Sequence, residues 1–471
     1  MASFGIDFGT TNTSVVECLI TEHGMTRTPY GENNQPFPSL VALHPEKPAM
    51  FGWDVKKRRS QLIAEGYHVI ASFKSILGSE QSIAVGDKKY SPLDVTALFL
   101  SYVKSRVEAM AERSMTEAVM AIPVDFKPEQ RRNLREAAKR AGIRVKSFVS
   151  EPTAAYVNCR KDLAGASNVA VFDWGGGTLD ISLISVEKQE VSELAVAGQR
   201  LGGNDIDQMI ARHLHSRIAR QEGDARSFDD LTPAERDQIV DRSEEAKKRL
   251  STDDSAPVRL MRYAGKVMIR DTITLDEFAK LIAARVDEAE SLLHYAAEKA
   301  GVSLGQMDAI LMVGGSCEMQ PIFQRMEKIG EEYHLNVCRP DAIQWSVAGG
   351  AAILSEQQPT YRLQKGFGVL LSDDSFYPVL EAGHAVPYKA QELRFGVVED
   401  TTNAVFVFAD ESKVVLKRKS VPIKGFTPEG IHLQCEIDDD MIVHIRIYSD
   451  YAERMAVEDQ INQLAFTYHI E

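Results

Sequence analysis

Two apolar segments of the chain share one pattern, in which the segment ends in an aspartate and is followed by glycine and threonine. The first lies within residues 4–16, and the second runs from Val169 to Asp180 and continues as an apolar alternation from Ile181 to Val186. Apolar runs of this length and spacing predict strands. Glycine allows the positive φ, or the close approach to a ligand, that a tight turn can need. Each segment therefore predicts a β-hairpin.

The remaining hydrophobic pattern predicts an α/β fold up to about residue 354, because helical and strand periods alternate. Capping signals such as Thr232-Pro233-Ala234-Glu235 mark helix starts. The predicted helices cover residues 54–80, 92–115, 129–141, 206–221, 232–251, 274–300 and 348–354, and further strands cover 118–124, 145–150 and 309–313.

From about Pro359 the helical period disappears and short β-type runs follow one another. They cover residues 369–371, 404–408, 413–416, 431–437, 441–448 and 464–469. Turn residues separate these runs, which predicts an all-β module of about one hundred residues.

The two hairpin turns also suggest a chemistry. Successive N–H groups in a glycine-rich turn form a concave anion site. Asp173 at a strand end can hold hydrated magnesium, and Thr178 can bond a phosphate oxygen or a small cation. A single such turn is compatible with an ordinary hairpin. Two turns of the same plan favour a duplicated fold whose halves each direct a phosphate loop into a shared cleft. Neither a Walker A loop nor a Rossmann fingerprint occurs.

Length and composition limit the classes of function. The 471 residues suggest roughly three domains. A net charge of −14 argues against nucleic-acid or acidic-membrane binding. No apolar run is long enough for a transmembrane helix, and a strand so near the N-terminus leaves no room for a signal peptide. The five cysteines are scattered without C-x-x-C spacing, which fits reduced thiols in the cytoplasm.

The paired hairpins resemble the actin-like ATPase superfamily, and further sequence blocks narrow the resemblance to the seventy-kilodalton heat-shock chaperone family. A sugar kinase shares the aspartate and threonines of the first hairpin, but it is not expected to carry residues 151–155 and 244–251 together. The blocks are residues 5–16, 119–156 with Ile122-Pro123 and Glu151-Pro152-Thr153-Ala154-Ala155, 171–184, 201–207, 244–251 and 312–316.

The resemblance implies a duplicated actin-like ATPase fold over residues 1–356, with two lobes around a nucleotide cleft. Lobe I would cover about 1–165 and lobe II about 166–356. Residues 357–471 would form a β-rich domain that resembles a peptide-binding sandwich without its helical lid.

The resemblance also assigns roles to individual residues in binding ATP or ADP. Residue type alone does not show whether Lys74 points into the cleft, since an isolated lysine is usually on the surface. The implied catalytic residues are Asp7, Lys74, Glu151, Asp173 and Thr178. The implied nucleotide-binding residues are Gly9, Thr10, Thr11, Asn12, Gly175, Gly176, Gly177, Gly202, Gly203, Glu244, Lys247, Lys248, Ser251, Gly314, Gly315 and Ser316. Magnesium held through water, or potassium, would lie at Asp7, Asp173 and Asp180.

Three features depart from the family pattern. Glu318 stands where the family usually has an arginine beside the base, which predicts weaker adenine stacking. Residues 355–366 lack the family's short, leucine-rich, acidic linker, which couples the nucleotide and peptide sites. No helical lid follows the β-module, so a peptide bound there is expected to leave quickly.

Two hypotheses follow. The first is a cytoplasmic heat-shock chaperone of the stress response that slowly hydrolyses ATP with Mg²⁺. It would bind unfolded or extended polypeptide through its β-domain, and a co-chaperone and a nucleotide-exchange factor would be its further partners. The alternative is an ATP-gated regulatory or adaptor protein whose β-domain binds one dedicated folded partner, which the atypical linker and the missing lid favour. Transfer of phosphate to a sugar or acetate would need an acceptor pocket, for which the sequence offers no candidate.

Overall fold

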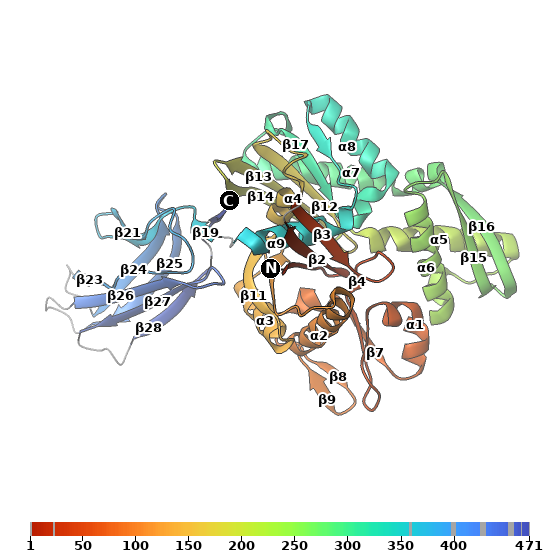
Figure 1. Ribbon diagram of the computed structural model, residues 1–471, viewed down its shortest axis with the longest axis horizontal. Helices are drawn as coiled ribbons and strands as arrows, with labels where there is room; N and C mark the ends of the chain where they lie inside the picture. The colour runs from red at the N-terminus through yellow and green to blue at the C-terminus, as the bar shows by residue number, and fades with distance from the viewer. Residues whose placement is uncertain are drawn as a thin grey trace. The chain divides into compact units, whose positions relative to one another are not determined.

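The computed structural model describes residues 2–21, 24–357, 360–396, 402–423, 430–450, 456–462 and 464–470 (Figure 1). The chain divides into two compact units, and each has a hydrophobic core of its own. The first unit comprises residues 1–125, 133–186 and 193–356, and the second comprises 126–132, 187–192 and 357–471.

The first half of the first unit is built on a sheet of strand order β11-β10-β1-β2-β3, with β4 paired to β2. The predicted hairpin is formed by β1 and β2, which pair antiparallel, while β10 and β11 extend the sheet in parallel. The strands are β1 (Ala2–Phe8), β2 (Asn12–Thr21), β3 (Gly24–Tyr30), β4 (Phe37–Pro38), β10 (Glu117–Ile122) and β11 (Arg144–Ser150).

The second half repeats this plan. Its strands in the first unit follow the order β18-β17-β12-β13-β14, in which β12 and β13 form the antiparallel hairpin and β17 and β18 add in parallel. The two orders correspond strand for strand, as expected for a duplicated fold. The strands are β12 (Asn168–Trp174), β13 (Leu179–Glu187), β14 (Glu190–Gln199), β17 (Ala309–Val313) and β18 (Asn336–Cys338).

Helices surround these sheets, and several begin at a serine or threonine that caps the first turn. Ser91 and Thr232 each form a complete capping box, with proline in the first turn of the helix. The helices are α1 (Gly52–Ala64), α2 (Pro92–Ala111), α3 (Pro128–Arg140), α4 (Glu151–Cys159), α5 (Gly203–Glu222), α6 (Pro233–Arg249), α7 (Leu275–Ala300), α8 (Gln320–Tyr333) and α9 (Ser346–Gln357).

The small residues of α9 let this helix approach its neighbours closely. A Cβ on Gly5 of β1 would collide with the backbone of α9 at Ala352, and a Cβ on Gly350 would collide with the backbone of α4 at Ala154. Glycine at both positions therefore allows the backbones to pack closely, and the helix predicted over residues 348–354 lies within α9.

The prediction of mostly helix over residues 54–80 is wrong beyond Ala64. Gly66 takes a φ of +89° just after α1, which favours glycine and ends the helical path. The chain then forms β7 (His68–Ala71), which pairs with β5 (Leu40–Leu43), and the 3₁₀ turn η1 (Phe73–Ile76). Pairing with a strand distant in the sequence outweighs the local helical pattern. The same region holds β6 (Met50–Phe51), β8 (Ile83–Val85) and β9 (Lys88–Tyr90).

The second unit is mostly β-structure. One sheet has the order β21-β20-β24-β25, and another has the order β22-β26-β27-β28 with β23 also paired to β26. Residues of both sheets share one core, in which Phe367 and Phe408 stack with ring centroids 5.6 Å apart. The strands are β20 (Phe367–Leu370), β21 (Phe376–Leu380), β22 (Tyr388–Lys389), β23 (Leu393–Gly396), β24 (Asn403–Asp410), β25 (Val415–Pro422), β26 (Gly430–Ile437), β27 (Val443–Ser449) and β28 (Val457–Ile461).

Two further strands of this unit, β19 (Thr360–Leu363) and β29 (Phe466–His469), pair with each other, and β29 also pairs with residues Glu190–Ser192 at the start of β14. The sequence did not predict β19, β21, β22, β23 or β28. The strand predicted at 413–416 instead begins at Val415, because Lys413 takes a φ of +64° in the turn before it. Within the segment 355–366, residues 358 and 359 lie outside the described residues.

Candidate functional site

A cleft of about 490 Å³ lies in the first unit, between the two hairpins. All but one of the predicted site residues line it, and the exception is Gly202. The lining includes Asp7, Gly9, Thr10, Thr11, Asn12, Lys74, Glu151, Asp173, Gly175, Gly176, Gly177, Thr178, Asp180, Gly203, Glu244, Lys247, Lys248, Ser251, Gly314, Gly315 and Ser316.

The two hairpin turns face each other across the cleft. A Cβ on Gly176 of the second turn would lie 2.8 Å from Cγ2 of Thr11 in the first, which is closer than Cβ contacts normally come. Glycine at position 176 is therefore required by the approach of the opposite loop.

The first turn is held in place by Ser39, which the sequence analysis did not single out. The backbone N–H of Ser39 donates to the Thr11 carbonyl at 2.8 Å, and its hydroxyl donates to the Gly9 carbonyl at 2.8 Å. Ser39 Oγ also lies 3.0 Å from the hydroxyl of Thr13. Its position after β4 gives no local signal, since only the pairing of β4 with β2 brings it here.

The second turn rests on the segment that opens α5. The N–H groups of Gly203 and Asn204 donate to the carbonyls of Gly175 and Gly176, at 3.0 and 2.8 Å. A Cβ on Gly202 would overlap the Gly176 carbonyl, so this glycine supports the loop from behind without lining the cleft. The hydroxyl of Ser316 donates to the Gly175 carbonyl at 2.8 Å. These bonds fix the loop in advance of any ligand.

Carboxylates gather at the floor of the cleft. The side chains of Asp7, Asp173 and Asp180 line the cleft, and protein surrounds them on their other sides. The pKa of Asp7 is raised to about 7, mainly by burial and also by Glu151, while Lys74 acts to lower it. Burial likewise raises the pKa of Asp173, and it raises that of Asp180 to about 6.

Lys74 is the cation beside these acidic groups. It is only 5% exposed, and its Nζ lies 2.9 Å from Oε1 of Glu151 at the start of α4. The 3₁₀ turn η1 carries the lysine inward, with the neighbouring Phe73 buried beside it. Local sequence did not decide whether Lys74 faces solvent or the interior.

This group of side chains suits a hydrated cation. Asp7, Glu151, Asp173 and Asp180 carry more negative charge than Lys74 offsets, and hard cations such as Mg²⁺ prefer carboxylate oxygens. Among the described residues, no three His, Cys, Asp or Glu side chains converge closely enough to hold a metal ion directly. Mg²⁺ usually keeps several of its waters, so the residues fit an ion bound through water.

The far end of the cleft is lined by the last two turns of α6, and its charges are mostly paired. Glu244 receives the ammonium groups of Lys56 at 2.8 Å and Lys248 at 2.9 Å. Burial alone would raise the pKa of Glu244, but Lys56 and Lys248 lower it to about 2. Lys247 pairs with Asp207 of α5 at 2.8 Å and also donates to the Gly203 carbonyl at 2.8 Å.

Three contributors to this end were missed by sequence reasoning, namely Lys56, Asp207 and Trp53. Lys56 belongs to a basic run on α1, a pattern that usually marks a solvated helix face. Its ammonium reaches Glu244 across the cleft and lies 5.2 Å from the centroid of the Trp53 ring. The packing of α1 against α6 brings Lys56 and Trp53 to the site, and the packing of α5 against α6 brings Asp207.

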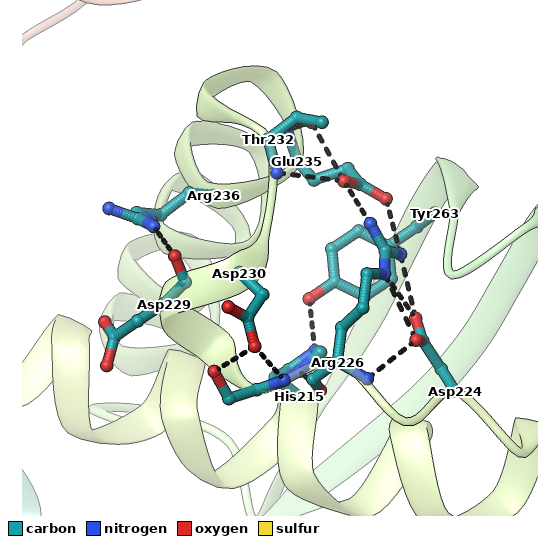
Figure 2. A network of polar contacts seen from close by, with 10 residues as sticks. His215, Asp224, Arg226, Asp229, Asp230, Thr232, Glu235, Arg236 and Tyr263 are labelled. Atoms are coloured by element: carbon teal, nitrogen blue, oxygen red, sulfur yellow. Dashed lines mark hydrogen bonds and ion pairs between the residues drawn. The ribbon is translucent and has the colours of Figure 1, made fainter.

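A polar network anchors the opposite end of α6 (Figure 2). The Arg226 guanidinium lies 2.8 Å from Asp224 and 3.0 Å from Glu235, which also accepts bonds from the backbone and hydroxyl of Thr232. Buried His215 bonds the Tyr263 hydroxyl at 2.9 Å and the Arg226 carbonyl at 3.0 Å. The network joins α5, α6 and the β15 strand (Ser255–Tyr263), so it holds the helix that carries Glu244 and Lys248.

A more open hollow of about 850 Å³ borders this network, next to the hairpin of β15 and β16 (Lys266–Thr274). Asp224, Arg226 and Glu235 on its wall already pair with one another. These three charges of the hollow therefore hold the fold together.

A family model described as Hsp70 protein matches residues 80–450, which is more than half of the chain. The chain belongs to the Hsp70 family. Hsp70 proteins are ATP-dependent chaperones that bind ATP and ADP with Mg²⁺, are ATPases, and bind polypeptide clients and co-chaperones. Family membership thus supports the predicted α/β fold with its β-rich region.

The matched range begins after the first hairpin and after Lys74. The position of these residues in the cleft therefore comes from the structure of this chain and not from the family match. No helix among the described residues combines the length and the apolar character needed to cross a bilayer.

Proposed function

We propose that this Hsp70-family protein hydrolyses ATP to ADP and phosphate in the cleft of its first unit. The observation that carries the proposal is the meeting of two glycine turns, at Thr11 and Gly176, above a group of acidic side chains that includes the Lys74–Glu151 pair. Phosphoryl transfer depends on positioning and charge stabilisation more than on covalent chemistry by the protein. The cleft offers both.

The phosphates would lie between the two turns. The backbone N–H groups and hydroxyls of residues 9–12 would bind β- and γ-phosphate oxygens from one side, and residues 175–178 would do so from the other. Gly202 and Gly203 would support the second turn. Since the loops are already held by Ser39 and Ser316, little reorganisation is needed on binding.

Asp7, Asp173 and Asp180 would hold Mg²⁺ through water, or K⁺, and the ion would supply charge neutralisation at the phosphates. Glu151 and Asp173 would orient the attacking water, and Lys74 would bond phosphate oxygens as negative charge develops. Thr178 would bond the transferred phosphoryl group. Each of these side chains lines the cleft.

The base and ribose would occupy the far end. Glu244, Lys247 and Lys248 come from α6, and Ser251 lies in the turn after it. Gly314, Gly315 and Ser316 follow β17 on the facing wall. With the triphosphate fixed at the hairpin turns, this end is where the rest of the nucleotide lies.

For the whole chain, we propose an ATPase domain over residues 1–356, with lobes over about 1–165 and 166–356, and a polypeptide-binding domain over 357–471. The β-domain would hold an extended or unfolded client. A co-chaperone and an exchange factor would act on the ATPase domain, in the cytoplasm. The alternative is a dedicated adaptor whose β-domain binds one folded partner, which the unusual composition of residues 355–366 favours.

The test is ATP turnover by the full chain, with and without an excess of a reduced, unfolded polypeptide. Lys74→Ala tests the site, and Lys89→Ala, an exposed lysine on β9, is the matched control. Turnover that needs Lys74 and rises with polypeptide supports the chaperone. Turnover that needs Lys74 but ignores polypeptide, together with capture of a single partner, supports the adaptor. Nucleotide binding without turnover would exclude the catalytic roles.

A further inference from the structure

Glu318 is an acidic side chain at the base end of the cleft that has no partner in the described part of the chain. It ends the 3₁₀ turn η4 (Gly315–Glu318), immediately before α8, and it lines the cleft with Lys248 and Ser251. No hydrogen bond or ion pair joins it to another described residue. The side chain is partly buried, and burial raises its pKa while Lys248 and Arg339 lower it.

The lysines near Glu318 are already paired, and the Arg339 guanidinium lies over the ring of Phe323, 3.8 Å from its centroid. Lys248 and Lys56 bind Glu244, and Lys247 binds Asp207. The side chain lines the cleft and is only partly buried, so water can reach its carboxylate when no ligand is bound. A ligand that displaces this water without supplying a donor would leave the acceptor unpaired, at a cost in free energy.

The surroundings of Glu318 suit an aromatic base. Met319 and Ile343 also line the cleft, so apolar side chains border the space that a ring would occupy. An ionised carboxylate can only accept hydrogen bonds. The edge of a base that meets Glu318 must therefore carry N–H donors.

The common purines differ in this property. Adenine carries one amino group at position 6, whereas guanine carries an amino group at position 2 beside a ring N–H. Both can donate to a carboxylate, and guanine can donate twice. A purine without an amino group would displace water from Glu318 and leave its carboxylate unpaired. Sites with a buried acceptor discriminate strongly against analogues that lack the donor.

We propose that Glu318 determines base specificity in this cleft by accepting hydrogen bonds from amino and ring N–H groups. The cleft then takes guanine nucleotides as well as adenine nucleotides and discriminates against purine nucleotides that lack these donors. This inference rests on the proposed function, because it requires that a nucleotide binds with its phosphates at the hairpin turns.

The experiment is equilibrium binding of ADP, GDP and purine riboside diphosphate to the full chain, with Mg²⁺, measured by calorimetry. Wild type is expected to bind GDP within about tenfold of ADP, and purine riboside diphosphate at least about tenfold more weakly, as the loss of one hydrogen bond to a charged group predicts. Glu318→Ala should remove the difference between ADP and the riboside. Glu327→Ala, on the exposed side of α8, should preserve it.

Glu318→Gln is a second variant of nearly the same shape. Its amide keeps one acceptor but adds a donor, so ADP binding should be retained while GDP, which donates twice, weakens at least about tenfold relative to ADP. ADP binding with no preference over the riboside, or a preference that survives in Glu318→Ala, would overturn the role of Glu318 and leave the proposed function standing. If none of the three nucleotides binds wild type, the proposed function fails and this inference fails with it.

Discussion

The ammonium of Lys74 lies 2.9 Å from the carboxylate of Glu151, although 77 residues separate them in the chain. The lysine comes from a 3₁₀ turn and the glutamate from the first turn of α4, and both line the cleft. In the absence of a nucleotide, the carboxylate of Glu151 compensates the positive charge of Lys74, a side chain that is almost completely buried.

Replacing Lys74 by methionine should reduce the rate of ATP hydrolysis by about a hundredfold or more, because a preorganised donor to the transferring phosphate is lost. Affinity for ADP should change by less than about tenfold, since the hairpin turns still bind the phosphates. Turnover and binding are measured on the same preparations. The control Lys89→Met should match wild type, and unchanged turnover in Lys74→Met would rule out its catalytic role.

Asp7→Asn should have opposite effects on stability and activity. Removing one of several carboxylates at the floor of the cleft relieves repulsion from Glu151 and the cost of burying the charge. We therefore expect a higher melting temperature for the nucleotide-free protein than for wild type. Addition of Mg²⁺ with ADP should stabilise the variant less than wild type, because one of the carboxylates that would hold the hydrated ion is lost. A lower melting temperature without nucleotide would contradict this account.

Gly202→Ala should weaken nucleotide binding even though Gly202 lies outside the cleft lining. The added methyl group would overlap the carbonyl of Gly176 and displace the second phosphate turn. We expect at least a tenfold rise in the dissociation constant for ADP, which corresponds to about 1.4 kcal/mol. Gly305→Ala is the matched control, since a Cβ there meets nothing within 4 Å. Equal affinities for the two variants would show that the turn adjusts without cost.

The Arg226–Glu235 pair predicts a dependence of stability on pH. Hydrogen bonds from Arg226 lower the pKa of Glu235 from 4.5 to about 2. The pair therefore stabilises the fold fully above about pH 4.5, and this contribution is lost as the pH falls toward 2. Glu235→Gln should lower the free energy of unfolding by about 1–2 kcal/mol at pH 6. The difference should shrink between pH 4 and pH 3.

Urea unfolding at pH 6, 4 and 3 measures this difference between Glu235→Gln and wild type. Glu245→Gln, an exposed glutamate on the same helix, serves as the control and should show little change at any of these values. A difference that is the same at all three values would mean that the neutral capping bonds of Thr232, and not the charge of Glu235, carry the effect.

Much of the fold follows from local patterns in the sequence. The apolar runs that end in Asp7 and Asp173 predict both hairpins, because a strand and its glycine turn are specified by adjacent residues. Capping signals at Thr232 predict the start of α6 for the same reason. The duplicated plan of the two sheets could be inferred once both hairpins were recognised.

Tertiary structure decided the features that depend on residues far apart in the chain. Residues 68–71 became a strand because β5 offers a pairing partner, and Lys74 turned inward because Glu151 and the cleft lie there. Ser39, Lys56 and Asp207 joined the site in the same way. Glu318 shows the converse. The sequence tells only that this residue is acidic, and the fold places it beside the cleft without a hydrogen-bond donor among its described neighbours. Local sequence determines strands, turns and caps because these form between neighbouring residues, whereas the pairing of charges is settled only when distant segments meet.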